Sequence, residues 1–378
     1  MTWLLGLTIL SYCCLVIWVF LGIRRLDNTR PAAKKRQTRF TIVVPFRNEA
    51  SRIAPLLRSI TQLDYPRSLF EIIFVNDESV DQGEVLIKDT LDAEATPINY
   101  CILDNERRSG SPKKDAITLA VETSKMDWIA CTDADCILPP RWLKNMEDRL
   151  QDGDLQGLIG GIRVNARPNL MEQLQLIEQL GLQQFAKAGV GWKRPILSNG
   201  ANLAYCRQAF MDVNGYQGND HLASGDDQFL VEKLSRNFPG GVSYIAQEAH
   251  LVTTYPEQSW NGLIQQRVRW ASKQTRNGPG LSRLLGIFIF LINLGIPLGF
   301  LMTFTSSLSW SVWAMFCLIK ILLDCSILAM STKTERESLH HFFIPFVSLI
   351  YPVIMGIVAL QSLGGSFNWK QRAYQNQQ

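Results

Sequence analysis

Long apolar segments lie near both ends of this 378-residue chain. The first runs from Trp3 to Ile23, and three more cover approximately 284–307, 310–330 and 342–362. Each is long enough for a helix to cross a hydrocarbon layer, which takes about 20 residues. The sequence therefore predicts an amino-terminal transmembrane helix over 1–23 and a carboxyl-terminal transmembrane region over 284–363.

The flanks of the first apolar segment predict its orientation. Seven basic residues follow it and are opposed only by Asp27: Arg24, Arg25, Arg30, Lys34, Lys35, Arg36 and Arg39. Such a flank favours the cytoplasmic side of a membrane. No basic residue precedes the segment and no small-x-small site ends it, so we expect a retained helix and not a cleaved signal peptide. The central part of a multi-pass protein of the inner cell membrane would then lie in the cytoplasm, after a basic linker over 24–39.

The topology of the other end stays open. Three more crossings would put Lys333 inside and the polar tail over 364–378 outside, yet Lys370 and Arg372 favour the inside for that tail. Pro345 and Pro352 lie near or within the last apolar stretch. That stretch is therefore a simple span, a re-entrant hairpin or an interfacial helix.

The centre of the chain alternates strand and helix patterns. Apolar runs rich in β-branched or aromatic residues predict strands at 40–46, 70–75, 98–103 and 128–132, with helical patterns between them. Strands buried on both faces and separated by helices indicate a parallel, doubly wound α/β sheet. Ligands of such sheets bind beyond the carboxyl ends of the strands, so we expect functional residues directly after each strand.

Polar residues do follow three of these strands, in the segments Arg47–Glu49, Asn76–Ser79 and Asp133–Asp135. One such turn commonly just caps backbone groups, but three together indicate a site. No GxGxxG or GxxxxGK[ST] loop is present, which disfavours a dinucleotide oxidoreductase or a P-loop kinase. The eight cysteines and four histidines show no zinc-site spacing, and we expect no nucleic-acid partner.

The Asp133-Ala134-Asp135 motif puts two carboxylates at the end of a strand. Mg²⁺ and Mn²⁺ are commonly held by one or two protein carboxylates, with diphosphate oxygens and water completing the shell. We therefore predict Asp135 and Asp133 as ligands of Mn²⁺ or Mg²⁺. An isolated motif of this type could equally be two turn aspartates.

Six segments in a fixed order resemble family 2 glycosyltransferases, particularly membrane-bound members related to ceramide glucosyltransferases and polysaccharide synthases. They are TIVVPFRNE at 41–49, VNDESVD at 75–81, PKKDA at 112–116, TDAD at 132–135, GDDQFL at 225–230 and QRVRW at 266–270. The resemblance covers about 40–275 and implies a GT-A fold, with a cytoplasmic glycosyltransferase domain over 40–283. It also implies a nucleotide-diphosphate sugar as donor, a UDP-sugar being favoured.

The resemblance carries several donor-binding roles over to this chain. It places Pro45 and Glu49 against the nucleoside, with Asn76 and Asp77 at the base or ribose, and Lys113 and Asp133 at the diphosphate. Asn76 departs from the family's usual Val-Asp-Asp, where a carboxylate stands in its place. Lys114 could serve in place of Lys113.

The resemblance also implies the catalytic residues. Asp227 matches the general base, and Asp226 replaces the glutamate that usually precedes it. A second carboxylate alongside would help one member of the pair to accept a proton. Gln266, Arg269 and Trp270 match the QxxRW motif, where a cation would stabilise the departing diphosphate. The same helix could instead be a basic segment beside the membrane.

The acceptor side is less specified. Leu170, Leu174 and Ile177 recur at helical spacing, which fits core packing or an amphipathic helix beside a lipid acceptor. SNGANLAY at 198–205 resembles the acceptor segment of lipid-modifying members, and so makes Asn199, Gly200 and Asn202 candidates.

We therefore expect an inverting, hexosyltransferase-like enzyme that transfers a sugar to a membrane-associated acceptor, with a lipid favoured. Two alternatives stay open. One is a processive polysaccharide synthase, and the other is a noncatalytic membrane scaffold or nucleotide sensor.

Overall fold

The computed structural model describes residues 2–26, 37–151, 153–220, 222, 225–277, 280–305, 307–363, 366–369 and 372–375. Most of the predicted basic linker and most of its arginines and lysines lie outside these residues, as does Lys370. The chain forms two compact units, and each is made of segments that are discontinuous in sequence. The catalytic unit, as we call it, comprises Asp27–Arg163 and Lys193–Tyr255, and the helical unit comprises Met1–Leu26, Val164–Trp192 and Pro256–Gln378. The predicted domain over 40–283 therefore contains segments of both units.

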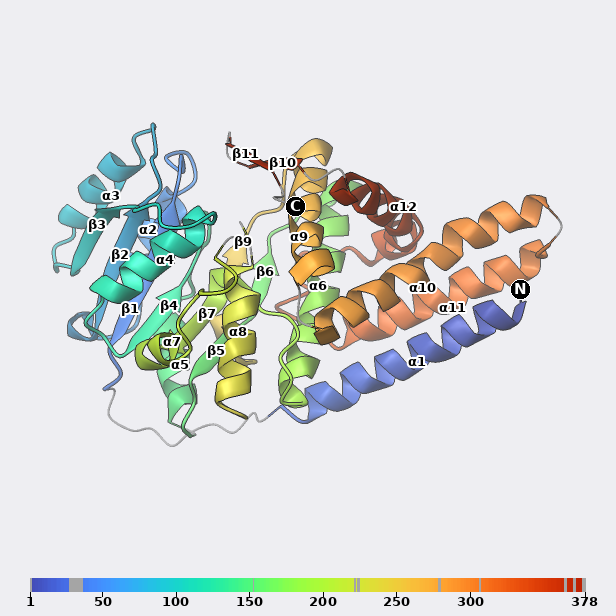
Figure 1. Ribbon diagram of the computed structural model, residues 1–378, viewed down its shortest axis with the longest axis horizontal. Helices are drawn as coiled ribbons and strands as arrows, with labels where there is room; N and C mark the ends of the chain where they lie inside the picture. The colour runs from blue at the N-terminus through green and yellow to red at the C-terminus, as the bar shows by residue number, and fades with distance from the viewer. Residues whose placement is uncertain are drawn as a thin grey trace. The chain divides into compact units, whose positions relative to one another are not determined.

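A seven-stranded sheet forms the centre of the catalytic unit, in the order β3-β2-β1-β4-β7-β5-β8 (Figure 1). Its strands are β1 (Phe40–Phe46), β2 (Phe70–Asn76), β3 (Tyr100–Asp104), β4 (Trp128–Cys131), β5 (Gly157–Gly160), β7 (Leu203–Cys206) and β8 (Val242–Ile245). All neighbours pair in parallel except β7, which is antiparallel to both β4 and β5. The predicted, mainly parallel α/β sheet is confirmed.

Helices and short turns connect these strands. The helices are α2 (Ala54–Thr61), α3 (Gly83–Asp92), α4 (Pro112–Thr123), α5 (Trp142–Leu150), α7 (Arg207–Asp212) and α8 (Asp226–Asn237), and η1 (Arg67–Leu69), η2 (Gly200–Asn202) and η3 (Glu248–His250) are single turns. A second, two-stranded sheet pairs β6 (Ile162–Val164) with β9 (Val252–Thr254).

Strand β1 lies between two parallel neighbours, and its residues explain why. Ile42, Val43 and Val44 are fully buried, so both faces of the strand are covered and no apolar–polar alternation is needed. In the register, Val43 pairs with Ile73 of β2 and with Cys131 of β4. The strand order reverses between β1 and β4, which makes the carboxyl ends of these two strands the expected place for a ligand.

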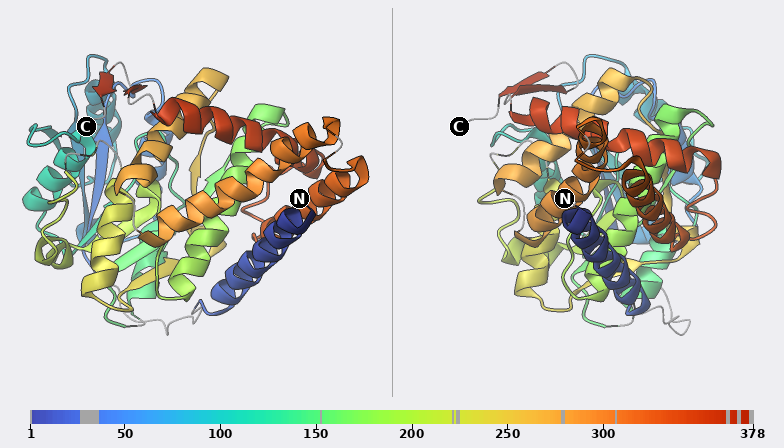
Figure 2. Two further views of the ribbon diagram at one scale, coloured as in Figure 1. Left: turned by 45° about the vertical axis from the view of Figure 1, so that its right-hand side comes forward. Right: turned by 90° about the vertical axis from the view of Figure 1, so that its right-hand side faces the viewer.

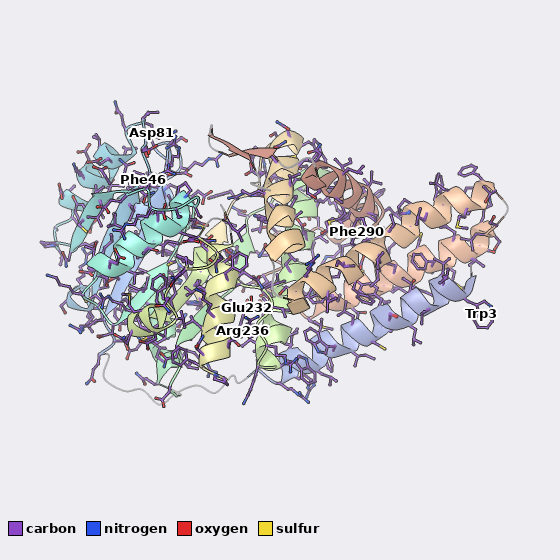
Figure 3. The ribbon with its side chains drawn as sticks, viewed as in Figure 1. Trp3, Phe46, Asp81, Glu232, Arg236 and Phe290 are labelled. Carbon is purple, nitrogen blue, oxygen red and sulfur yellow. The ribbon has the colours of Figure 1, made fainter. Side chains whose placement is uncertain are left out.

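The helical unit contains the apolar segments. Its elements are α1 (Thr2–Arg24), α6 (Leu170–Gly191), α9 (Trp260–Asn277), α10 (Gly280–Phe304), α11 (Trp310–Ala329), the turn η4 (His341–Phe343), α12 (Ile344–Leu363) and a hairpin of β10 (Ser366–Trp369) and β11 (Arg372–Gln375). Among the residues that the structure describes, four helices are long and apolar enough to cross a membrane: Trp3–Arg24, Ser282–Phe304, Trp310–Ala329 and His341–Ser362. Trp3, at the start of α1, points away from the other helices and is 89% exposed (Figure 3).

The last apolar segment is one continuous helix. Pro345 lies in the first turn of α12, where backbone N–H groups have no acceptor within the helix, so a proline costs no hydrogen bond there. Helix α12 also continues through Pro352. The re-entrant hairpin is therefore wrong for this segment.

Helix α6 packs closely against α1. A Cβ atom added at Gly191 would lie 1.9 Å from the Gly22 carbonyl oxygen, so only glycine permits this approach. Trp192 stacks on Trp18 with ring centroids 6.2 Å apart and donates from Nε1 to the Trp18 carbonyl. The predicted amphipathic segment is thus a helix of the helical unit and not part of the sheet's core.

Candidate active site

The loops that follow β1 and β2 are tied together by hydrogen bonds. Asn48 accepts from the Val80 amide, and Asp81 accepts from the Ala50 amide at 2.7 Å. Phe46, which ends β1, and Asp81 are labelled at this edge in Figure 3. Asn48 and Glu78 both have positive φ angles, 51° and 55°, in a region that residues other than glycine rarely occupy. Such backbone strain is common at functional sites.

Asp77 is a buried carboxylate at this edge. Its Oδ1 accepts from Asn105 Nδ2 at 2.8 Å and lies 3.1 Å from Arg107 Nη2. Arg47 donates to the Asp77 backbone carbonyl at 2.6 Å. Asn105 and Arg107, which follow β3, were not predicted, although the rule that singled out the residues after the other strands applies to them as well.

The other predicted donor-side residues of these loops lie nearby in sequence and structure. Asn76 accepts from the Ser79 amide at 2.9 Å, so its side chain fixes the turn after β2. Glu49 is buried and its carbonyl accepts from the Arg52 and Ile53 amides. Pro45 is the second-last residue of β1. It is partly exposed and pairs with Val75 of β2.

Lys113 joins two of the predicted carboxylates. Its ammonium nitrogen lies 2.8 Å from Asp133 Oδ1 and 3.3 Å from Asp226 Oδ2. Burial acts to lower the pKa of Lys113, but the two carboxylates outweigh it and raise that pKa above its ordinary value. Residues from α4, the end of β4 and the start of α8 therefore meet around one permanent positive charge.

Gly200 lies against this cluster. A Cβ atom added there would be 3.1 Å from Asp226 Oδ2 and 3.3 Å from Lys113 Nζ. Asn199 precedes it and caps the turn η2 by accepting from the Ala201 amide at 3.0 Å. Of the predicted acceptor segment, these two residues therefore lie beside the charged cluster.

Asn202 lies elsewhere. Its side chain is fully buried, accepts from Trp142 Nε1 at 2.9 Å and donates to the carbonyls of Gly161 and His250. The amide is fully used in holding these segments together, so its prediction as an acceptor contact does not fit the structure. The neighbouring His250 is also buried, and burial lowers its pKa to about 3.

Lys114 is buried and binds backbone carbonyl groups. It is 1% exposed and donates to the carbonyls of Asn219 at 2.6 Å and Leu222 at 3.0 Å. Its ammonium nitrogen also lies 5.1 Å from the Phe229 ring centroid. Because Lys114 is enclosed in this way, Lys113 is the one of these two lysines that lies beside Asp133 and Asp226.

Asp133 and Asp135 leave the end of β4 as predicted, and both are partly exposed. Ala134, between the two aspartates, and Cys136, directly after them, are buried. Burial raises the pKa of the Cys136 thiol well above its usual range. Among the described residues, no group of three or more His, Cys, Asp or Glu side chains could hold a metal ion. The pair therefore fits an ion only if a ligand supplies further oxygens, which is the arrangement that Mg²⁺ and Mn²⁺ adopt with diphosphates.

Asp226 and Asp227 form the first turn of α8. The helix begins after Gly225, whose φ of 84° suits glycine, and no side chain caps it. Asp227 Oδ1 accepts from the Gln228 amide at 2.8 Å. Carboxylates are favoured at a helix amino terminus, because the backbone N–H groups there carry partial positive charge.

The QxxRW residues lie on α9 of the helical unit. Gln266, Arg269 and Trp270 are all partly exposed. Arg267, between them, stacks its guanidinium 4.2 Å from the Trp270 ring centroid and donates to Gln266 Oε1. The sequence analysis predicted Arg267 only as part of a basic helix. It did not predict the contacts of Arg267 with Gln266 and Trp270.

Family models and relatives agree with this geometry. The models for glycosyl transferase family 2 and glycosyl transferase family group 2 match residues 41–212 and 128–328. A probable glycosyltransferase of Bacillus subtilis, YdaM, is 25% identical over 245 residues, which are 63% of this chain and 55% of that protein. The poly-beta-1,6-N-acetyl-D-glucosamine synthase of Staphylococcus aureus is 24% identical over 235 residues, 61% of this chain and 53% of that protein. The chain thus spans about half the length of these curated relatives.

A solved structure shares the fold. It is the mannosyltransferase PcManGT from Pyrobaculum calidifontis in complex with GDP-Man and Mn²⁺, with a TM-score of 0.60 and 16% identity over 95% of this chain and 99% of that one. The second family model by itself covers more than half of the sequence. The chain belongs to glycosyltransferase family 2 and has the GT-A fold.

Proposed function

We propose that this protein is an inverting glycosyltransferase that moves a sugar from a nucleotide-diphosphate sugar to a lipid acceptor in the membrane. The observation that carries the proposal is the convergence of Lys113, Asp133 and Asp226 at the carboxyl edge of the sheet. This edge is where α/β sheets bind nucleotides. The four apolar helices support a membrane acceptor.

The donor binds, in this proposal, with its nucleoside against Pro45, Glu49 and Asp77 and its diphosphate beside Lys113. A UDP-sugar is the favoured donor. Asp133 and Asp135 would hold Mn²⁺ or Mg²⁺ beside the diphosphate, and the ion would supply positive charge to the leaving group. Without a donor, Lys113 binds the Asp133 carboxylate. When the donor binds, a phosphate oxygen would replace this carboxylate as the partner of Lys113.

The chemistry is a single displacement. Asp227 takes the proton of the acceptor hydroxyl, the hydroxyl oxygen bonds to the anomeric carbon, and the bond from that carbon to the diphosphate oxygen breaks. Asp226 tunes Asp227, and Arg269, with Gln266 and Trp270, stabilises the charge that develops on the diphosphate. An α-linked donor would give a β-linked product. Asn199 and Gly200 lie on the acceptor side.

The test uses the full chain in lipid nanodiscs, with isotope-labelled UDP-, GDP- and other nucleotide sugars and a bacterial lipid extract. The expected result is one glycolipid that mass spectrometry detects with the wild type and not with Asp227→Asn. Nuclear magnetic resonance of its anomeric proton assigns the linkage. Absence of both transfer and donor hydrolysis with every donor would leave the noncatalytic scaffold or nucleotide sensor as the better explanation.

A processive synthase is the second candidate, and the name of the Staphylococcus aureus relative supports it. The same assay separates the two functions. A single added sugar supports a glycolipid transferase, whereas a ladder of products that lengthens with donor concentration supports a polymer synthase.

A further inference from the structure

Helix α12 differs in direction from the other three apolar helices. Figure 1 looks almost along α12, whereas α1, α10 and α11 extend side by side across the same view. In the right-hand view of Figure 2 this relation is reversed, and α12 extends across the picture. Within the helical unit, α12 therefore runs across the bundle of α1, α10 and α11 and not along it.

One face of this segment carries an apolar stripe along its whole length. Six large apolar side chains are exposed: Phe342, Phe346, Leu349, Val353, Ile357 and Leu360. Their spacing of three or four residues puts them on one side of a helix. On the other side Val347, Ile354 and Val358 are buried. The helix therefore packs through one face and presents the other to its surroundings.

The packed face contacts polar and charged groups. Tyr351 donates to Glu178 Oε1 of α6 at 3.0 Å, and Glu178 in turn binds Arg267 of α9. Tyr351 is near the middle of α12, so these charges would lie deep in the hydrocarbon layer if α12 crossed it. Paired charges do occur at that depth, as Lys320 and Asp324 would in α11, but they are rare. At the membrane surface the same charges are close to water.

The ends of the neighbouring helices mark the side on which α12 lies. Ser348 donates to Asp324 Oδ2 of α11, five residues before α11 ends at Ala329, or about 8 Å along the helix. The segment between α11 and α12 carries Lys333 and Arg336, and its Glu335 binds Lys187 of α6 at 2.5 Å. Basic residues favour the cytoplasmic side and anionic headgroups.

We propose that α12 is an interfacial helix, bound to the lipid bilayer through the stripe of Phe342, Phe346, Leu349, Val353, Ile357 and Leu360. The chain then crosses the membrane three times, through α1, α10 and α11, and α12 stays on the side where α9 ends and Lys333 lies. The stripe inserts into the boundary between headgroups and acyl chains, while the opposite face, with Val347, Ile354 and Val358, is buried. The inference rests on the membrane location proposed above.

Cysteine reporters test it in full-length protein from which the eight native cysteines have been removed. Lys333→Cys lies before α12, Gln361→Cys in its last turn, and Ser307→Cys between α10 and α11; all three positions are exposed. An impermeant maleimide is applied to intact cells and to permeabilised cells. We expect Lys333→Cys and Gln361→Cys to react under the same condition and Ser307→Cys under the other.

Each other outcome has a distinct meaning. If Gln361→Cys reacts together with Ser307→Cys, α12 crosses the membrane and the inference is overturned. If Ser307→Cys and Lys333→Cys react under the same condition, α11 does not cross, and the membrane location itself fails.

The depth of the stripe gives a second measurement. Fluorescent labels at Phe346→Cys, Val353→Cys and Leu360→Cys are compared in vesicles that contain lipids brominated at different depths along the acyl chain. An interfacial helix gives all three labels strongest quenching by the same shallow lipid. A spanning helix gives Val353→Cys strongest quenching by the deepest lipid, which would contradict the proposal.

Discussion

Arg267 donates from Nε to Glu178 Oε2 at 2.6 Å, and both side chains are about 10% exposed or less. The pair joins α9, which carries the QxxRW motif, to α6. Since Arg267 also contacts Gln266 and Trp270, the position of these two motif residues depends on a carboxylate from another helix. Arg267 is thus a positioning residue.

The first prediction concerns this pair. Glu178→Gln should lower the free energy of unfolding by about 3–5 kcal/mol, because it leaves a buried guanidinium without its counter-charge. Arg267→Lys keeps the charge but loses the planar fork and the stacking on Trp270, so transfer should slow while nucleotide affinity stays unchanged. Thermal denaturation and single-turnover transfer measure the two effects. Arg236→Lys is the control, since Arg236 is 74% exposed; equal behaviour of both lysine variants would refute the positioning role.

The second prediction tests the proposed base. Asp227→Asn should reduce transfer by about 10²–10⁴-fold, because an amide of nearly the same volume cannot take the proton. Nucleotide affinity should stay close to that of the wild type, and Asp226→Asn should cost less. The control is Glu232→Gln on the same helix, whose carboxylate binds Arg236 (both labelled in Figure 3). Wild-type transfer by Asp227→Asn would move the search for the base to Asp226.

The third prediction concerns metal and nucleotide together. Mn²⁺ should bind the wild type weakly alone and more tightly with a nucleoside diphosphate, since two carboxylates supply only part of the shell. Asp135→Ala should lose this coupling, whereas Asp89→Ala on the exposed surface of α3 should retain it. Isothermal calorimetry on the full chain in nanodiscs measures the coupling. Identical metal-dependent affinities for Asp135→Ala and the wild type would exclude Asp135 as a ligand.

The fourth prediction follows from the buried His250. Its pKa is about 3 in the folded protein against an ordinary value of 6.5, so the unfolded chain binds a proton between these values and the folded chain does not. Stability should therefore fall as the pH decreases below 6.5, with this residue contributing roughly 1.4 kcal/mol per pH unit. In denaturant titrations at pH 7, 6 and 5, His250→Asn should show a shallower decline. Parallel declines would show that His250 titrates normally.

The fifth prediction concerns the side of the catalytic unit. Val85 on α3 is 52% exposed and can therefore carry a reporter. In the cysteine-free protein, Val85→Cys should react with an impermeant maleimide only after permeabilisation, in agreement with the basic flank after α1. Reaction in intact cells would reverse the orientation of the whole chain.

The sequence identified most of the sheet, because β1, β2 and β4 are apolar runs flanked by polar turns. Strands β5, β7 and β8 were not predicted. Each has only four residues, and β7 acquires its antiparallel neighbours from the tertiary structure. A four-residue strand shows no periodic pattern, and β4, which is equally short, was recognised only from its place in the strand-helix alternation.

Individual site residues show where sequence reasoning reaches its limit. Lys113 and Lys114 are adjacent and chemically alike, and only the packing of α4 sends one to the carboxylates and buries the other. Asn202 sits in a segment of small polar residues that looks like a site, yet it holds backbone carbonyls in the interior. Motifs thus located the segments, while burial separated the candidate site residues from the structural side chains.

The discontinuous make-up of the two units has a practical consequence for producing this protein. Helix α6 lies between catalytic-unit segments in the sequence, so no cut near either end of the chain can detach the catalytic unit intact. A fragment over 40–283 would retain α6 without α1, α11 or α12. Lys187 would lose Glu335, and Trp192 would lose Trp18. Such a fragment is expected to aggregate, and purification should start from the detergent-extracted full chain.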